Sequence, residues 1–550
     1  MSLIAAAPLI AIAVMALHSS GDTWPHLIEN VLPDAVRRTL ILMVGVAIIA
    51  LVTGTGTAWL VTMYRFPGRG LFQWLLLLPL AMPTYIIAFC YIELFDYSGE
   101  IQTALRIIFG WQNARDYWFP DIRSLGGAVF VMGAVLYPYV YITARASFVA
   151  QSVCVIEASR TLGRSASETF WQIALPLARP ALAAGTALAL METLNDIGAV
   201  EFFGVQTLTV TVYDTWLDRG SLAGAAQISC VMLFFVLAVL GLERALRSGK
   251  RFHHTTGKYR DLPEELLSGA KGILATAACA LPILVGFILP TYVLARDAMV
   301  HLSFGLTGDF WRAALHSLVL SVAAAVLAVI FAIVLAYGRR QTHSKLVQIA
   351  SFVPAVSYAV PGTVLAIGLL IPLAGLDNKI DDVARSLFGV STGLIFSGTA
   401  FAIVVAYTIR FLAASLGSVE AGLSKITRNI DSAGRTLGAS VTEMLWSVHL
   451  PLLRPALGGA ALIVFVDSMK ELPATLLLRP FNFDTLATQV FTLASLYRYE
   501  EAGLSALTIV LVSLAPVLLL HGFIATSRPG FSGSRGGSAK THEELALPIS

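Results

Sequence analysis

The amino-acid sequence predicts an all-α integral membrane protein with about 12 transmembrane helices, arranged as two parallel repeats of six. Composition predicts the membrane class, because 57% of the residues are hydrophobic and only 13% are charged, which is too little polar surface for a soluble chain. A duplication predicts the repeat: residues 158–182 and 433–457, 275 positions apart, share 15 of 25 aligned residues. Both copies are polar and lie between apolar runs, so lipid-facing composition does not explain their likeness.

Apolar runs of the length that a bilayer core of about 30 Å requires of a helix recur along the whole chain. We expect twelve spans, in residues 3–17, 39–62, 71–92, 125–149, 181–200, 222–242, 272–294, 314–337, 346–373, 391–413, 458–478 and 503–523. The first run is short and resembles the apolar core of a signal peptide. It is not preceded by basic residues, so we expect it to be a retained helix.

The basic residues of the loops orient the chain in the membrane. With residues 63–70 on the cytoplasmic side, the cytoplasmic loops hold 24 Lys and Arg residues and the outer loops hold 12, while Lys470 lies within a span. Arg410 is counted here in a cytoplasmic loop, 410–457. Short loops rich in Lys and Arg remain in the cytoplasm, so both copies of the repeated segment are expected there.

The duplication also divides the chain into parts. Equivalent elements lie six spans apart, and an even number of spans makes the two halves parallel repeats and not inverted ones. We expect a first half in 1–242 with its polar loop in 157–182, a basic cytoplasmic linker in 243–271, a second half in 272–524 with its polar loop in 432–457, and a disordered cytoplasmic tail in 525–550. The tail is rich in Ser and Gly, which is typical of disorder.

The repeated segment has the pattern of short amphipathic helices near the membrane surface, because its apolar positions are separated by Arg160, Arg164 and Glu168. Gly163 is expected to turn the chain between two such helices, since glycine tolerates positive φ. Pro176 is expected to end the second helix. Spacing alone leaves two interpretations open: a docking point for a symmetric partner, or an interfacial helix with no partner.

Two pairs of carboxylates lie inside predicted spans. Glu192 and Asp196 are four residues apart, as are Asp467 and Glu471, which would place each pair on one helix face. Lys470 is the one lysine within a span. Ionisable groups in hydrocarbon are costly, so they usually face a cavity or a partner. The five residues therefore predict either a polar translocation path or a buried ionic network that joins the halves.

Several motifs of enzymes are not found in the sequence. There is no GxxxxGK[ST] phosphate loop, no HExxH, no GxSxG and no paired cysteine site, and the four cysteines lie in or beside apolar runs. We therefore expect no catalytic residues, no ATP hydrolysis by this chain, no cofactor and no bound metal. The net charge of +3 gives no indication of nucleic-acid binding.

The repeated segment resembles the EAA loop of binding-protein-dependent ABC importer permeases, through Glu157-Ala158, Leu162-Gly163 and Leu175-Pro176. The second copy departs from the pattern, with Ser432 at the acidic position and Asp431 before it. The resemblance implies a fused two-half permease of the bacterial inner membrane, a type I importer-like fold, a cytoplasmic ATPase dimer and a periplasmic binding protein. The residues it assigns to ATPase coupling are Glu157, Ala158, Arg160, Gly163, Glu168, Arg435, Gly438 and Glu443.

A second resemblance concerns the substrate. Residues 191–210 and 466–488 are similar to the corresponding stretches of iron(III) importer permeases, with Lys470 to Pro473 and Arg479 to Phe481 favouring iron. Permeases for thiamine, phosphonates or polyamines share the architecture and remain alternatives. An ion-coupled secondary transporter is the alternative from another class, since it too is built from six-span repeats. Such a transporter does not need a matched pair of cytoplasmic loops.

Overall fold

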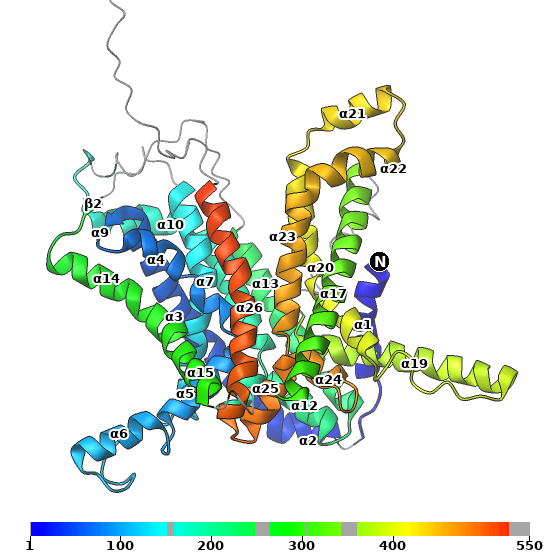
Figure 1. Ribbon diagram of the computed structural model, residues 1–550, viewed down its shortest axis with the longest axis horizontal. Coiled ribbons are helices and arrows are strands. Elements are labelled where there is room, and N and C mark those ends of the chain that lie inside the picture. The colour runs from blue at the N-terminus through cyan, green and yellow to red at the C-terminus, as the bar shows by residue number, and fades with distance from the viewer. Residues whose placement is uncertain are drawn as a thin grey trace, which may run out of the picture.

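The computed structural model describes residues 2–21, 23–150, 159, 161–247, 265–300, 302, 306–342 and 360–526. In this part of the chain the elements are helical, except for one parallel pair of two-residue strands, β1 (Tyr64–Arg65) and β2 (Glu265–Leu266). Long helices run side by side through the molecule, α21 and α22 stand at one end, and α6 and α19 project sideways near the other (Figure 1). The predicted all-α membrane class is confirmed.

The helices up to residue 247 are called the first series here, and those from residue 270 onwards the second series. The first series is α1 (Ser2–Ala16), α2 (Thr23–His26), α3 (Leu32–Met63), α4 (Arg69–Leu75), α5 (Thr84–Phe95), α6 (Glu100–Phe109), α7 (Leu125–Ala150), α9 (Ala166–Thr169), α10 (Leu175–Asn195), α11 (Gly198–Phe202), α12 (Leu208–Leu217) and α13 (Leu222–Arg247). The second series is α14 (Ala270–Ile283), α15 (Leu289–Val300), α17 (Gly308–Gln341), α19 (Gly362–Phe388), α20 (Ala400–Ser424), α21 (Arg428–Thr436), α22 (Val441–Met444), α23 (Leu450–Met469), α24 (Pro473–Leu478), α25 (Leu486–Ser495) and α26 (Tyr499–Thr526).

Fewer helices than predicted qualify as membrane spans. Among the described residues ten are long and apolar enough, or eleven if the bent pair Arg69–Ala81 and Thr84–Phe109 forms one span. The expected first span is α1, whose apolar part is too short to count, and part of the expected span 346–373 lies outside the described residues. The bent pair turns by 91° just before α5, where Pro83 precedes the helix, as its lack of an N–H permits.

Five-residue π turns precede prolines at four places. They are η1 (Leu27–Val31) before Pro33, η3 (Phe170–Ala174) before Pro176, η4 (Leu284–Ile288) before Pro290 and η5 (Leu445–His449) before Pro451. In each, the residue just before the proline donates its N–H to the first carbonyl of the turn. The wider turn makes room for the proline ring, which clashes with the carbonyl of an ordinary α-turn.

The π turns explain one wrong prediction. Pro176 was expected to end a helix, but α9, η3 and α10 form one continuous helix, Ala166–Asn195. The equivalent helix of the second copy, Val441–Met469, likewise runs through Pro451. Each copy of the repeated loop therefore continues into a candidate membrane span without a break in the helix.

Small residues allow close packing around α7. A Cβ atom on Gly54 of α3 would lie 2.8 Å from the Tyr137 carbonyl oxygen, and one on Gly185 of α10 would lie 2.8 Å from that of Tyr139. Both helices therefore contact the backbone of α7 directly. Close contact of this kind replaces the hydrophobic effect, which does not act between helices surrounded by lipid.

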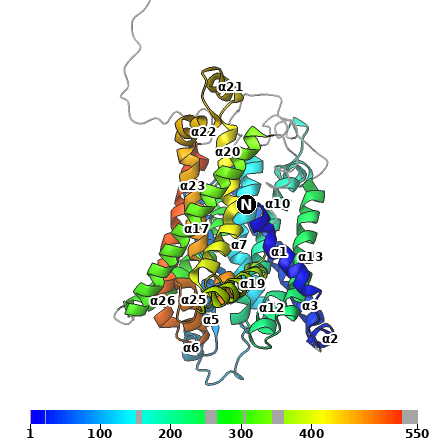
Figure 2. The ribbon, with the colours of Figure 1, turned by 90° about the vertical axis from the view of Figure 1, so that its right-hand side faces the viewer.

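Helices α1 and α15, near the start of the two series, each contact helices of both series. Helix α1 packs against α13 of its own series and α19 of the other, while α15 packs against α26 of its own series and α5 of the other. Figure 1 shows α1 beside α19, and Figure 2 shows it beside α13. Ile12 of α1 is fully buried. Gly368 of α19 lies so close to α1 that a Cβ added to this glycine would be 2.4 Å from the Pro8 carbonyl oxygen.

Candidate functional site

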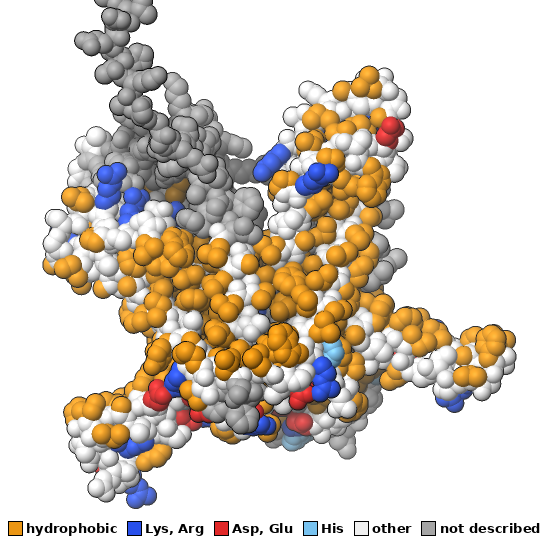
Figure 3. Space-filling view, in the orientation of Figure 1, with side chains coloured by type: hydrophobic (Ala, Val, Ile, Leu, Met, Phe, Trp, Pro, Cys, Tyr) orange, Lys and Arg blue, Asp and Glu red, His pale blue; other side chains and the backbone are white. Residues whose placement is uncertain are grey.

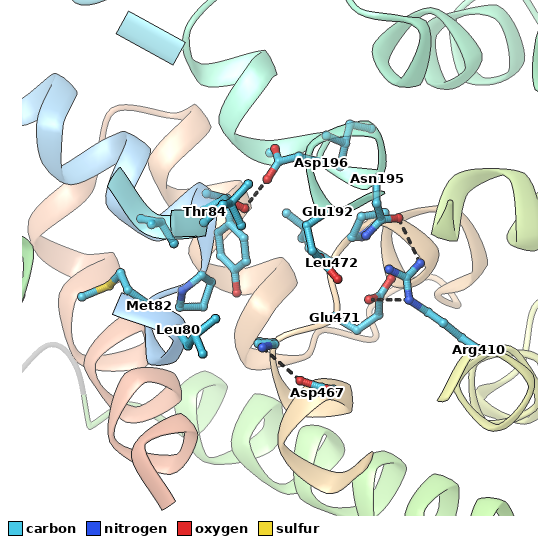
Figure 4. A pocket seen from close by; sticks show the side chains of 18 of the residues that line it. Leu80, Met82, Thr84, Glu192, Asn195, Asp196, Arg410, Asp467, Glu471 and Leu472 are labelled. Atoms are coloured by element: carbon cyan, nitrogen blue, oxygen red, sulfur yellow. Dashed lines mark hydrogen bonds and ion pairs between the residues drawn. The ribbon is translucent and has the colours of Figure 1, made fainter. Parts of the chain in front are cut away.

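A cavity of about 100 Å³ lies where three helix breaks from both series meet. The breaks are the turn before α5, the turn between α10 and α11, and the turn between α23 and α24. All five residues that were predicted to form a path or network line this cavity: Glu192, Asp196, Asp467, Lys470 and Glu471. They converge from separate segments (Figure 4).

The helix breaks correct the expected geometry of the carboxylates. Helix α10 ends at Asn195, so Asp196 lies in extended backbone beyond Glu192 and not on the same helix face. Helix α23 ends at Met469, so Lys470 and Glu471 also lie in a turn. Breaks of this kind are tolerated at membrane depth where the backbone lines a cavity.

Arg410 is the residue of this site that the sequence analysis placed elsewhere. It was counted in a cytoplasmic loop, but it lies within α20 and is 5% exposed. Its Nε atom lies 3.4 Å from Oε2 of Glu471, and its Nη1 atom donates to Oδ1 of Asn195 at 2.9 Å. The guanidinium group therefore joins the end of α10 to the turn after α23.

Gly362 closes this network at the first residue of α19. Its N–H donates to Oδ1 of Asn195 at 2.6 Å. An added Cβ would lie 2.7 Å from both Nη1 of Arg410 and Oε1 of Glu471, closer than atoms can approach without rearrangement. The position therefore has no room for any side chain while the ionic contact between Arg410 and Glu471 is present.

The remaining charged groups have their own partners. Asp196 is 7% exposed and accepts hydrogen bonds from the Thr84 hydroxyl and, at 2.7 Å, from the Ala199 N–H. Lys470 pairs with Asp467 at 3.0 Å, and both side chains are about one quarter exposed. The hydroxyl of Tyr85, which also lines the cavity, is buried without a hydrogen-bond partner among the described residues. The lining thus contains four carboxylates against two basic groups.

The two copies of the repeated loop have matching geometry where both are described. Gly163 and Gly438 have φ values of 82° and 85°, which confirms the predicted glycine turn. Glu168 and Glu443 each occupy the third position of a capping box, with Ser165 and with Ser440 as N-cap. The carboxylates thus stabilise the helix starts locally, a role that the Ser-x-x-Glu spacing could have indicated. Glu157, Ala158 and Arg160 lie outside the described residues.

Each loop exposes large apolar side chains at equivalent positions. Leu162 and Leu437 are 80% and 86% exposed, and Trp171 and Trp446 are 64% and 68% exposed. Arg435 donates to Oε1 of Gln341 at 2.7 Å. Exposed apolar groups clustered on one end of a protein commonly mark an interaction surface.

An ionic network positions α21 in the second loop. Asp431 accepts from Arg340 through Oδ2 at 2.8 Å and contacts Nε2 of His449 through Oδ1 at 2.7 Å. Arg340 also donates to the carbonyls of Leu423 and Ile426 at the end of α20. Asp431, which stands before the aligned Ser432, therefore connects α21 to α17, α20 and η5.

Asp431→Asn should weaken the position of α21 while leaving the membrane helices intact. Loss of charge-assisted hydrogen bonds typically costs about 1.5–3 kcal/mol each, so ATPase stimulation in reconstituted vesicles is expected to fall several-fold. Asp309→Asn is the matched control, because Asp309 pairs with Arg312 in a fully exposed contact at the other end of α17. Equal stimulation in both variants would contradict the positioning role.

Comparison with known proteins agrees with this arrangement. Residues 50–251 match the family described as binding-protein-dependent transport system inner membrane component. The chain is therefore similar over these residues to the inner-membrane component of such transporters, and ten of its described helices are long and apolar enough to cross a membrane.

Two ferric permeases are similar to this chain over most of its length, and a sulfate permease over less than half of it. It is 26% identical over 491 residues to the Fe(3+)-transport system permease protein FbpB 2 of Haemophilus influenzae, covering 88% of this chain and 89% of that protein. It is 22% identical to the ferric transport system permease protein FbpB of Actinobacillus pleuropneumoniae, covering 94% and 75%. It is 29% identical over 255 residues to the sulfate transport system permease protein CysT of Synechococcus elongatus, covering 45% and 88%.

Proposed function

We propose that this chain is the permease of an ATP-driven importer for ferric iron, which it passes from a periplasmic binding protein to the cytoplasm by alternating access. The observation that carries the proposal is the cavity at the helix breaks, with its excess of carboxylates over basic groups. A cation is attracted electrostatically to such a lining, and the attraction is strong because the surroundings have a low dielectric constant. Sulfate or a phosphonate would be repelled by the same lining. The ferric permeases similar to this chain over most of its length support iron.

We propose further that residues 1–242 and 272–524 are two equivalent halves joined by the linker 243–271, with 525–550 as a tail. Two sets of matched contacts support this division. The capping boxes and π turns of the two loops recur at an offset of 275. The Thr39 hydroxyl accepts from the Leu208 N–H at 3.0 Å, and the Ser317 hydroxyl accepts from the Leu486 N–H at 2.8 Å. Each residue of the second bond lies 278 positions after its counterpart in the first.

Coupling to a cytoplasmic ATPase dimer is proposed for the two loops. The support is their equivalent left-handed glycines and their exposed Leu and Trp pairs. Two equal docking points suit a symmetric partner. A secondary transporter has no use for such a pair, so the loops favour ATP-driven import. The continuous helix from each loop into the membrane offers a rigid connection to the cavity.

Uptake of ferric iron by vesicles that contain the permease, its ATPase and its binding protein tests this function. We expect uptake that requires ATP and all three components. Uptake of thiamine or a polyamine in place of iron would show a different substrate. Uptake driven by an ion gradient without the ATPase would show a secondary transporter.

Glu192→Gln and Glu471→Gln should each lower ferric uptake about tenfold, which corresponds to about 1.4 kcal/mol of barrier, without lowering membrane abundance. The reason is that a neutral amide attracts a cation much less than a carboxylate does. The charge-balanced change for Glu471→Gln is Arg410→Met, because Glu471 is paired with Arg410 whereas Lys470 is paired with Asp467. Full restoration of uptake by that double change would show that the groups form only a structural network.

A further inference from the structure

Two arms leave the bundle sideways at the end opposite α21 and α22 (Figure 1). The first arm consists of α6 and its return segment 110–122. The second arm consists of the outer part of α19 from residue 376 and its return segment 389–398. Each arm continues a helix whose inner end lies at the cavity. Helix α5 begins just after Pro83, which lines the cavity, and α19 begins at Gly362, which is bonded to the lining residue Asn195.

The second arm has a continuous apolar stripe. Leu376, Ile380, Val383 and Leu387 recur at the spacing of one helix face. Leu376, Val383 and Leu387 are 49%, 55% and 70% exposed, so the described part of the chain leaves this face uncovered.

The other side of the second arm is fastened to its return segment. Asp377, which is 1% exposed, accepts N–H groups from Ile395, Phe396 and Ser397 at 2.8–3.2 Å. One turn further, Asp381 accepts the Thr392 N–H at 2.7 Å. The arm is therefore an ordered unit whose return segment is bound to the polar face, and its stripe is left for another occupant.

The first arm repeats this arrangement. Tyr117 of its return segment donates to Oε1 of Gln102 at 2.6 Å and accepts from Arg106 at 3.0 Å. The tip of α6 exposes Ile107, Ile108 and Phe109, at 76%, 72% and 61%. Aromatic rings follow directly, with Phe109, Trp111 and Tyr117 stacked at 4.7 Å between neighbouring centroids. Such aromatic groups are typical of the membrane–water interface.

We propose that both arms lie in the interfacial layer of the bilayer leaflet on this side, with their apolar stripes against the acyl chains. In Figure 3 the apolar side chains of the second arm continue the apolar surface of the bundle along the arm's upper edge, and a basic side chain lies on its lower edge. A soluble partner approaching from outside would meet the charged edge. The stripe instead faces the layer in which the lipid already surrounds the bundle. Only the name of the leaflet, the periplasmic one, rests on the proposed function.

Spin labels on single cysteines test this placement in a permease whose own four cysteines are replaced by serine. The permease is reconstituted in vesicles of phosphatidylethanolamine and phosphatidylglycerol. Labels at Val383→Cys and Leu387→Cys should be several-fold more accessible to oxygen, which partitions into lipid, than to a water-soluble nickel chelate. Labels at Asn378→Cys and Asp382→Cys, on the opposite face and exposed, are the matched controls and should show the reverse.

The same measurement on the first arm compares Ile108→Cys with Thr103→Cys. Equal access to the nickel chelate at apolar and polar positions would overturn the proposal. So would loss of access to both reagents at positions 383 and 387 on addition of the periplasmic binding protein, because the stripe would then bind protein. Lipid exposure at these positions in a permease that fails to take up iron would leave this proposal standing and contradict the proposed substrate.

Discussion

Arg410→Met is expected to abolish transport and to lower the stability of the permease. The substitution leaves the buried Glu471 carboxylate without its cation and Oδ1 of Asn195 without one of its two donors. Removing one member of a buried ion pair typically costs about 3–5 kcal/mol. The measurements are ferric uptake in vesicles and the midpoint of thermal unfolding in detergent.

The double variant Arg410→Met with Glu471→Gln separates stability from transport. It removes both charges, so the unfolding midpoint should return towards that of the unmodified permease. Uptake should stay low, because the carboxylate is still missing from the cavity wall. Recovery of uptake together with stability would show that the pair only braces the helix ends. An unchanged midpoint in the single variant would contradict the buried contact itself.

Gly163→Val and Gly438→Val are expected to disconnect the permease from its ATPase. Both glycines are left-handed, and the space around them is open, so the cost is backbone strain, about 1–2 kcal/mol for an L-residue. Relief of that strain would reorient α21 relative to α22 in the second loop, and the chain before Gly163 relative to α9 in the first. ATPase co-purification and ATP-driven uptake should both fall, while membrane insertion remains normal.

Gly220→Val is the matched control for these two variants. Gly220 also has positive φ, at 65°, and open space around it, but it lies between α12 and α13, away from the loops. It should retain ATPase co-purification. An equal loss in all three variants would show a general effect of strain, and no loss in the loop variants would contradict the docking role.

The site was largely readable from the sequence because charge in an apolar span is costly. That rule selected Glu192, Asp196, Asp467, Lys470 and Glu471, and all five line one cavity. It failed for Arg410, which was counted with a loop because it lies three residues from the expected end of its span at 413. Helix α20 continues to Ser424, and the residues between Arg410 and Glu420 are uncharged, so this longer run was the available signal.

The local geometry was harder to predict than the residues. Spacing of four suggested helix faces, but the helices break at Asp196 and at Lys470. Pro473 was a warning, since a proline lacks the N–H that would continue a helix and its ring clashes with the carbonyl four residues earlier. The π turns gave no such warning, because the same prolines that they precede ordinarily indicate a helix end.

The contact between α1 and α19 has a consequence for the order of events during biosynthesis. Helix α1 is synthesised well before α19, against which it packs and which begins roughly 350 residues later in the chain. At a synthesis rate of about 5–20 residues per second, α1 waits roughly 20–70 s in the membrane with that face covered by lipid or by a chaperone. During this interval Ile12 has no α19 beside it. The packing of α19 against α1 is therefore a contact that forms only after this interval.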